Sequence, residues 1–156
     1  MSSTRRPCAL PDTSCLIHLE RVDCLNLLYT LYDEFRIPTA VRDEFGRTPD
    51  GFDVVPVQDR SLVQKLRSTL DAGEAELIAL ALESENVHII LDDAAARARA
   101  KNFDLTVLGT IGLLLRAKKF GHIDVVRPVL RALRGKGFWI SSALYQRALQ
   151  EAGEVD

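Results

Sequence analysis

Short hydrophobic runs alternate with amphipathic helical patterns along most of this chain. Runs of four or five apolar residues bounded by turn residues are typical of buried strands, and apolar residues spaced three and four apart are typical of helices packed on one side. Strands separated by helices favour βαβ units, in which a parallel sheet is covered by helices. The expected strands are 8–11, 35–38, 54–57, 87–91 and 105–108.

Capping and breaking residues indicate where the helices begin. Ser14 can cap a helix directly after the first strand, Thr39 caps a short helix, and Asp59 starts another. Gly73 is expected to break the chain before an Ala-rich helix. Besides the short helix after Thr39, the expected helices cover 14–19, 25–28, 59–70, 74–85, 94–101, 110–119, 124–134 and 141–151.

Length and composition favour one domain over residues 1–156, with a helical C-terminal portion at about 122–156. A chain of 156 residues with 47% hydrophobic content is long enough to bury a core. The apolar stretches are shorter than the roughly 20 residues that a membrane helix needs, and the N-terminus lacks the apolar core of a signal peptide. We therefore expect a cytoplasmic protein without a membrane partner, whose three cysteines are reduced thiols.

The net charge of −2 conceals an uneven distribution of charge along the chain. The stretch from Arg97 to Lys136 holds ten of the twenty basic residues against only Asp104 and Asp124. A positive surface of this kind can bind nucleic acid. The ordinary interpretation is that these side chains are solvated helix faces, and the sequence leaves both open.

Acidic residues follow the expected strands. Asp12 ends the first strand, Glu44 lies in the helix after the second, and Asp92 with Asp93 ends the strand at 87–91. The carboxyl ends of neighbouring parallel strands meet at one edge of the sheet, where ligands bind. Carboxylate oxygens gathered there suit Mg²⁺ or Mn²⁺. Asp12 could instead cap the first helix, although Thr13 and Ser14 are also placed to do so.

Within each acidic pair, helix geometry favours one member as the ligand. Glu74 and Glu76 differ by a rotation of about 200°, so they cannot point the same way. Glu74 begins an apolar series and is the first choice, although it can also act as a favourable charge at the helix N-terminus. Asp92 ends its strand, whereas Asp93 can cap the next helix and pair with Arg97 four residues on.

The Gly109–Thr110 turn is a candidate substrate contact. Glycine lets the backbone approach a ligand closely, and the helix N-terminus that follows can hold a phosphate oxygen. Thr110 acting as an ordinary N-cap explains the same residues equally well.

Several motifs in order resemble the PIN-domain family of ribonucleases, in particular the VapC-like toxin branch of bacteria and archaea. Each motif is weak alone, but their joint order and spacing over about residues 8–121 are fairly specific. One difference is that the Gly109–Thr110 turn has no carboxylate where many family members carry a further acid. The motifs are Pro11-Asp12-Thr13-Ser14, Val41-Arg42-Asp43-Glu44, Gly73-Glu74-Ala75-Glu76 with Ile78-Ala79-Leu80-Ala81, Leu91-Asp92-Asp93 with Arg97, and Gly109-Thr110-Ile111-Gly112-Leu113-Leu114.

The resemblance implies a Rossmann-like three-layer α/β/α sandwich with a central parallel sheet, and metal-dependent cleavage of single-stranded or loop RNA. One or two Mg²⁺ or Mn²⁺ ions are expected, together with a role as the toxin of a toxin–antitoxin pair. The site it implies has catalytic Asp12, Glu44, Glu74 and Asp92, metal ligands Asp12, Asp92, Asp93 and Glu76, and substrate contacts Ser14, Arg97, Gly109 and Thr110.

The resemblance also implies partners, namely an RNA substrate, a small antitoxin protein and a second copy of the chain in a homodimer. Leu144, Tyr145, Ala148 and Leu149 could form a dimer or partner face, or pack into the protein's own core. The alternative function is a catalytically incomplete PIN-like module that binds RNA or a protein. A receiver domain, a phosphatase with Asp-x-Asp after the first strand and a nucleotide-triphosphate enzyme are disfavoured, because their motifs do not fit this sequence.

Overall fold

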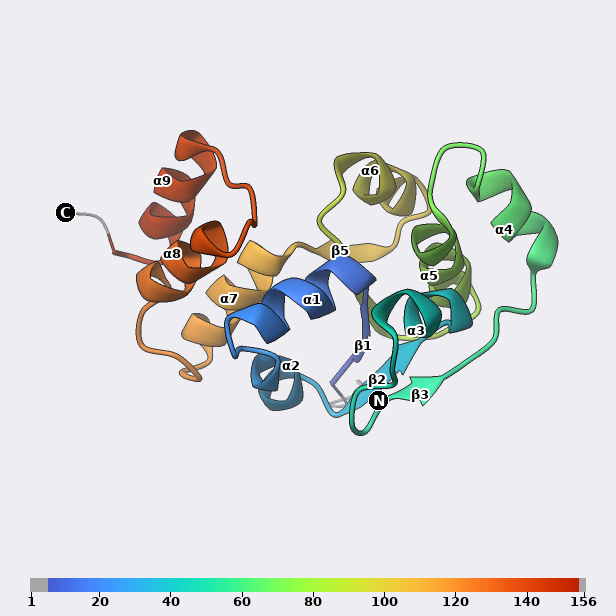
Figure 1. Ribbon diagram of the computed structural model, residues 1–156, viewed down its shortest axis with the longest axis horizontal. Coiled ribbons are helices and arrows are strands. Elements are labelled where there is room, and N and C mark those ends of the chain that lie inside the picture. Colours follow the sequence, from blue (N-terminus) through green and yellow to red (C-terminus); the bar gives the residue numbers. More distant parts are fainter. Residues whose placement is uncertain (1–5, 155–156) are drawn as a thin grey trace, which may run out of the picture.

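A parallel five-stranded sheet forms the centre of the computed structural model, which describes residues 6–154 (Figure 1). Its strands are short, and burial is concentrated in the three central strands, as expected for a sheet whose middle is covered on both faces. In chain order they are β1 (Cys8–Pro11), β2 (Glu34–Ile37), β3 (Asp53–Val54), β4 (Val87–Ile90) and β5 (Thr106–Leu108).

Helices cover both faces of the sheet, which confirms the expected α/β sandwich. One layer includes α1, α2 and α7, and the other is built from α4, α5 and α6, while α8 and α9 lie together at one end of the molecule (Figure 1). The helices are α1 (Thr13–Arg21), α2 (Asn26–Leu31), α3 (Thr39–Phe45), α4 (Arg60–Leu66), α5 (Ala72–Leu82), α6 (Ala94–Asn102), α7 (Thr110–Lys119), α8 (Arg127–Gly135) and α9 (Ser142–Glu151).

The alternation of strand side chains divides the core into two clusters. Ala9 in β1 packs into the cluster beneath α1 and α7, whereas its neighbours Cys8 and Leu10 pack into the cluster beneath α4, α5 and α6. In β4, Ile90 and Ile89 divide between the same two clusters. The two central strands β1 and β4 are therefore apolar on both sides, as their sequences indicated.

The strand order is β3-β2-β1-β4-β5, so the direction of winding reverses between β1 and β4. The chain moves from β1 to β2 and β3 on one side, then crosses to β4 and β5 on the other. Ligands of open α/β sheets bind at such a reversal, outside the carboxyl ends of the strands. Asp12 and Asp92 follow these two central strands.

Three expectations about helix starts were wrong. Ser14 is exposed inside α1, whose N-cap is Asp12, and α3 begins at Thr39 with Pro38 as its N-cap. Gly73 does not break the chain but lies in the first turn of α5, because Asp71 caps that helix. Several boundaries also differ by a few residues from those expected, since helix and strand ends depend on contacts that the local pattern does not contain.

The apolar positions of α9 pack mostly inward. Tyr145, Ala148 and Leu149 belong to the core cluster, and only Leu144 of this group is exposed. Intramolecular packing therefore accounts for three of these four residues. Within residues 6–154 no helix is long and apolar enough to cross a membrane.

Candidate active site at the carboxyl edge of the sheet

Asp12 lies directly after β1, at the reversal of strand order. Its backbone forms the N-cap of α1, but its side chain makes no capping hydrogen bond, and the residue is only 5% exposed. Burial raises the pKa of the Asp12 carboxyl to about 7; nearby Glu74, Asp71 and Glu44 raise it further, and the Thr13 N–H opposes the change. A buried, uncapped carboxyl among other acids is the electrostatic pattern of a functional site.

Glu44 joins the N-termini of two helices beside Asp12. Its Oε2 accepts a hydrogen bond from the Thr13 hydroxyl at 2.9 Å, and its Oε1 accepts one from the Gly73 N–H at 2.8 Å. A Cβ atom at Gly73 would lie 2.7 Å from both carboxylate oxygens, so glycine is needed for this approach. Glu44 therefore fixes α1, α3 and α5 around Asp12.

Glu74 forms a reciprocal capping box with Asp71 at the start of α5. The Glu74 N–H donates to Asp71 Oδ1 at 2.9 Å, and the Asp71 N–H donates to Glu74 Oε1 at 3.2 Å. Glu74 is 8% exposed, and burial raises the pKa of its carboxyl, as do the charges of Asp71, Asp93 and Glu44. Glu74 thus serves as a cap and also belongs to the group of acids around Asp12.

Glu76 points away from that group. Its Oε1 accepts from the Ala40 N–H at 3.0 Å at the start of α3, and its Oε2 pairs with Arg60 Nη1 at 3.0 Å. The residue is 7% exposed, so its carboxylate is buried rather than turned to solvent. Both oxygens are engaged in holding α3 and α4 against α5, which leaves its predicted metal ligation without support from the geometry.

Asp92 reaches from the end of β4 to the N-terminus of α7. Its Oδ1 accepts from the Thr110 N–H at 2.8 Å, and its Oδ2 accepts from the Thr110 hydroxyl at 2.6 Å. Thr110 is fully buried and is not the N-cap; that position belongs to Gly109, which has no side chain to fill it. Asp92 therefore supplies a carboxylate at the turn whose own sequence lacks one.

Arg97 lies beside Asp92 because Gly109 leaves room for it. Arg97 Nη1 donates to the Leu91 carbonyl oxygen at 3.0 Å. A Cβ atom at Gly109 would lie 2.6 Å from Arg97 Nη1 and 3.1 Å from Asp92 Oδ1. The close approach expected at Gly109 is thus made by a guanidinium and a carboxylate of the protein itself.

Asp93 and Ser14, the other two predicted site residues, lie nearby in different roles. Asp93 Oδ2 accepts from the Ala96 N–H at 2.9 Å and caps α6, as one interpretation of the sequence anticipated. The Asp93–Arg97 pairing anticipated with it is replaced, since Arg97 donates to Leu91 instead. Ser14 is exposed, two residues after Asp12.

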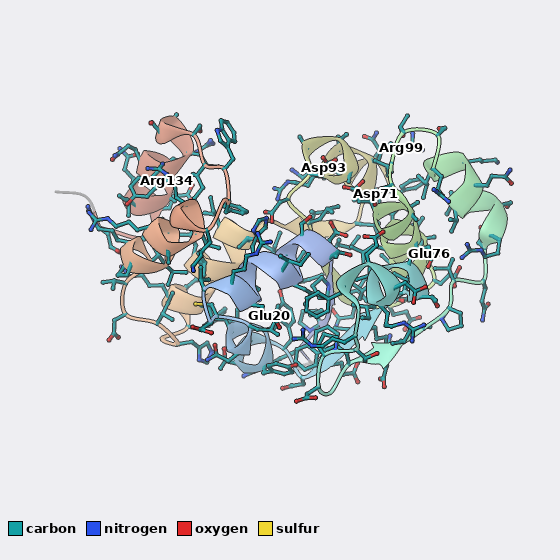
Figure 2. The ribbon with its side chains drawn as sticks, viewed as in Figure 1. Glu20, Asp71, Glu76, Asp93, Arg99 and Arg134 are labelled. Carbon is teal, nitrogen blue, oxygen red and sulfur yellow. The ribbon has the colours of Figure 1, made fainter. Side chains whose placement is uncertain are left out.

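The acids divide into two groups. The first group surrounds Asp12 and Glu74, whose carboxyl pKa values are raised by burial and then by the charges of acidic neighbours. It is called the acidic cluster below and consists of Asp12, Glu44, Asp71, Glu74 and Asp93. Figure 2 labels Asp71 and Asp93 at the starts of α5 and α6, with Glu76 nearer α3. Asp92 instead faces Thr110, and its charge acts on the pKa values of Cys15 and His18.

Asp71 is the member of the cluster that the sequence interpretation missed. Its signal was present: Asp71 stands three residues before Glu74 and directly before an apolar helix, which is the spacing of a capping box. That pattern would have moved the start of α5 ahead of Gly73 and placed one more carboxylate beside Asp12.

The acidic cluster fits a divalent cation in chemistry, but not as a closed set of ligands. Carboxylate oxygens are the ligands that Mg²⁺ and Mn²⁺ prefer, and a cation would relieve the repulsion around buried Asp12. Among residues 6–154, however, no group of three or more His, Cys, Asp or Glu side chains could hold a metal ion as placed. Most of these carboxylates hold backbone N–H groups, so Asp12 is the centre of any such site.

Not every residue of the basic stretch is available for a ligand. Arg127 Nη2 donates to the Glu154 carbonyl oxygen at 2.6 Å, and the Glu154 carboxylate accepts from the backbone N–H groups of Val126 and Arg127. Arg127 therefore ties α8 to the end of α9, whereas Arg131 is exposed on α8.

The fold and this site define an α/β domain with buried carboxylates at the switch point of a parallel sheet. The model of a family described as PIN domain matches residues 8–154, and the chain belongs to this family. PIN domains are typically nucleases and generally use divalent metal ions. A comparison with curated proteins finds no significant match.

Proposed function

We propose that this protein is a metal-dependent endoribonuclease that cleaves single-stranded or loop RNA with Mg²⁺ or Mn²⁺. The observation that carries the proposal is Asp12, a buried carboxyl at the switch point whose side chain caps no helix and is surrounded by further acids. Burying such a charge is costly unless a cation compensates it. Membership of the PIN-domain family supports nuclease chemistry at this edge.

In this proposal Asp12 and Glu74 hold the cation from one side, and Asp92 and Asp93 hold it from the end of β4. A bound divalent cation lowers the pKa of a water molecule and stabilises charge on the scissile phosphate. Glu44 keeps α1 and α5 in place through Thr13 and Gly73. Glu76 is left out as a ligand, since its carboxylate points away from the acidic cluster toward Ala40 and Arg60.

Arg97 is the residue proposed to bind the substrate backbone beside this site. It uses Nη1 on the Leu91 carbonyl, and it lines the pocket that also contains Asp92. A guanidinium has further donors that match phosphate oxygens. Gly109 keeps the guanidinium close to Asp92.

The deciding experiment is cleavage of a structured RNA by purified protein with Mn²⁺ or with EDTA. We expect Mn²⁺-dependent products that Asp12→Asn abolishes, with folding intact. Asp124→Asn is the matched control, because it removes the same charge from an exposed loop position. Cleavage that persists in EDTA, or in Asp12→Asn with Mn²⁺, would contradict the proposal.

The second candidate is a catalytically incomplete PIN-like module that binds RNA or a protein. One observation favours it: Glu44, Glu74, Asp92 and Asp93 all accept hydrogen bonds from backbone N–H groups, so their arrangement is stable without a cation. Calorimetric titration with Mn²⁺ separates the two. The nuclease should bind Mn²⁺ in a manner that Asp12→Asn abolishes, whereas the binding module should show no difference between the two proteins.

We further propose, from the resemblance to VapC-like proteins, that the chain is the toxin of a toxin–antitoxin pair and forms a homodimer. Exposed Leu144 is a candidate contact for a second chain. Induced expression in a bacterial host should arrest growth with the wild type and not with Asp12→Asn. Sedimentation equilibrium should give twice the mass of the chain, and a monomer over the micromolar range would exclude the dimer.

A further inference from the structure

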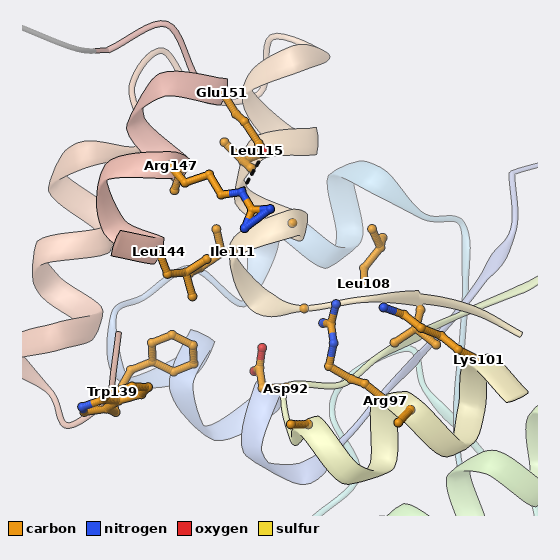
Figure 3. A pocket seen from close by; sticks show the side chains of 17 residues that line it. Asp92, Arg97, Lys101, Leu108, Ile111, Leu115, Trp139, Leu144, Arg147 and Glu151 are labelled. Atoms are coloured by element: carbon orange, nitrogen blue, oxygen red, sulfur yellow. Dashed lines mark ion pairs between the residues drawn. The ribbon is translucent and has the colours of Figure 1, made fainter. Parts of the chain in front are cut away.

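A pocket of about 720 Å³ opens between α6, α7 and α9, beside the end of β4. Figure 3 shows Arg97 and Lys101 on one side of it and Trp139 and Leu144 on the other, with Arg147 reaching toward the middle. Asp92 and Gly109 also line the pocket, so it is continuous with the candidate active site. None of the functional roles proposed above uses Trp139, Lys101 or Arg147.

Trp139 is held facing outward by its neighbours in the loop between α8 and α9. Phe138 and Ile140 are buried, at 9% and 5% exposure, whereas the indole between them is 83% exposed. The Phe138 N–H donates to the Leu133 carbonyl at 2.9 Å, and Arg134 donates to the Ile140 carbonyl at 3.3 Å. This anchoring presents a large aromatic ring to solvent on a backbone that is fixed on both sides.

The charged side chains around the pocket are mainly cationic. Arg97, Lys101 and Arg147 contribute three positive charges, against one negative charge each from Asp92 and Glu151. Arg147 pairs with Glu151 at 4.0 Å, but both side chains are well exposed, so this ion pair is weak. Both carboxylate oxygens of Asp92 accept hydrogen bonds from Thr110, one from its N–H and one from its hydroxyl. Cations around an exposed aromatic ring and an apolar wall match a nucleotide, whose base stacks while its phosphate binds the cations.

We propose that this pocket binds an unpaired nucleobase of the RNA, stacked on the indole of Trp139, with the adjoining phosphates held by Arg97, Lys101 and Arg147. That the nucleic acid is RNA rests on the proposed function. A base in this pocket places the neighbouring phosphodiester beside Asp92 and Arg97, because the same residues line the pocket and the site. Trp139 is then a determinant of where single-stranded RNA is cut.

The sequence offers a direct probe, because Trp139 is the only tryptophan of the chain. Titration of the wild type with single-stranded RNA hexanucleotides in EDTA should quench its fluorescence saturably, with weaker binding as salt increases. An abasic oligonucleotide of the same length supplies the phosphates without the bases. It should bind in a salt-dependent manner and leave the fluorescence nearly unchanged.

Variants test the same contact by anisotropy of labelled RNA. Trp139→Ala should weaken binding about 10–100-fold, and Trp139→Phe should retain most of the affinity, since a base still has an aromatic face to stack on. Phe120→Ala is the matched control, because Phe120 is 54% exposed but lies outside the pocket. It should bind RNA as the wild type does.

Absence of quenching with every RNA sequence, or wild-type affinity in Trp139→Ala, would overturn the inference and leave the pocket to an occupant other than RNA. The result is separable from the nuclease proposal. Quenching without Mn²⁺-dependent cleavage would support the pocket and refute the nuclease. Cleavage by Trp139→Ala at the wild-type kcat/KM would refute the pocket and leave the nuclease intact.

Discussion

Replacing Asp12 with asparagine should stabilise the metal-free protein at pH 8. Its carboxyl pKa is 3.8 when unperturbed and about 7 in the fold, mainly because the group is buried. The folded state therefore binds this proton more tightly than the unfolded state, and the free energy of unfolding falls as the pH rises from about 4 to 7. The displacement of the pKa corresponds to at most about 4 kcal/mol, all of it lost above pH 7.

Asparagine does not carry this penalty, but its amide must still leave water. We therefore expect Asp12→Asn to gain about 1–3 kcal/mol at pH 8, which is about 2–12 °C in melting temperature for a chain of this size. At pH 4 the two proteins should be nearly equal, because the wild-type carboxyl is then protonated in the fold. Added Mn²⁺ should stabilise the wild type and not the variant.

The assay is urea unfolding followed by far-UV circular dichroism between pH 4 and 8, since the exposed Trp139 reports poorly on the core. Asp124→Asn should differ from wild type by less than about 0.5 kcal/mol at every pH, as expected for an exposed site. A loss of stability in Asp12→Asn at pH 8, or a difference that does not change with pH, would refute the reasoning and make the carboxylate structural.

Three further substitutions test the remaining side chains. Glu76→Ala should cost about 1–3 kcal/mol in urea unfolding, because it leaves the partly buried Ala40 N–H without its acceptor; an altered Mn²⁺ affinity would instead indicate that Glu76 is a metal ligand. Glutamine at position 74 can still accept the capping hydrogen bond, so Glu74→Gln should be as stable as the wild type while its cleavage rate falls about 10–100-fold. Full activity of this variant would mean that Glu74 acts only as a helix cap. Gly109→Ala should displace Arg97 and lower the salt slope of RNA binding by about one, and an unchanged slope would argue against a phosphate contact there.

The sequence predicted the strands and the acids that follow them, because both depend on local patterns. The apolar run 8–11 favoured a buried strand, and Asp12 after it was expected at the edge of a parallel sheet. That β1 and β4 are neighbours at the reversal was not contained in either segment, since strand order follows from how the helices pack. The sheet edge was thus predictable, whereas the closeness of individual side chains was not.

Side-chain partners were the part that the sequence could not supply. The rotation between Glu74 and Glu76 was correctly expected to send them to different places, but their partners come from α3, α4 and the start of α5 itself. Likewise, the bond between Asp92 and Thr110 joins residues that are 18 positions apart. No pattern in the sequence indicated that Trp139 would be exposed, because its exposure depends on how the loop after α8 is anchored.

The pairing of β1 with β4 also determines when the site can exist. Cys8 pairs with Val87, so one of the two neighbours of the central strand comes from the second half of the chain. Contacts between such remote segments form slowly, since a long loop must close first. During synthesis, a nascent chain that ends before β4 already carries Asp12 but has nothing across the switch point. Any chemistry at this edge therefore begins only after most of the protein has been made. Synthesis of the segment that carries Asp12 and assembly of the site around it are thus separated in time.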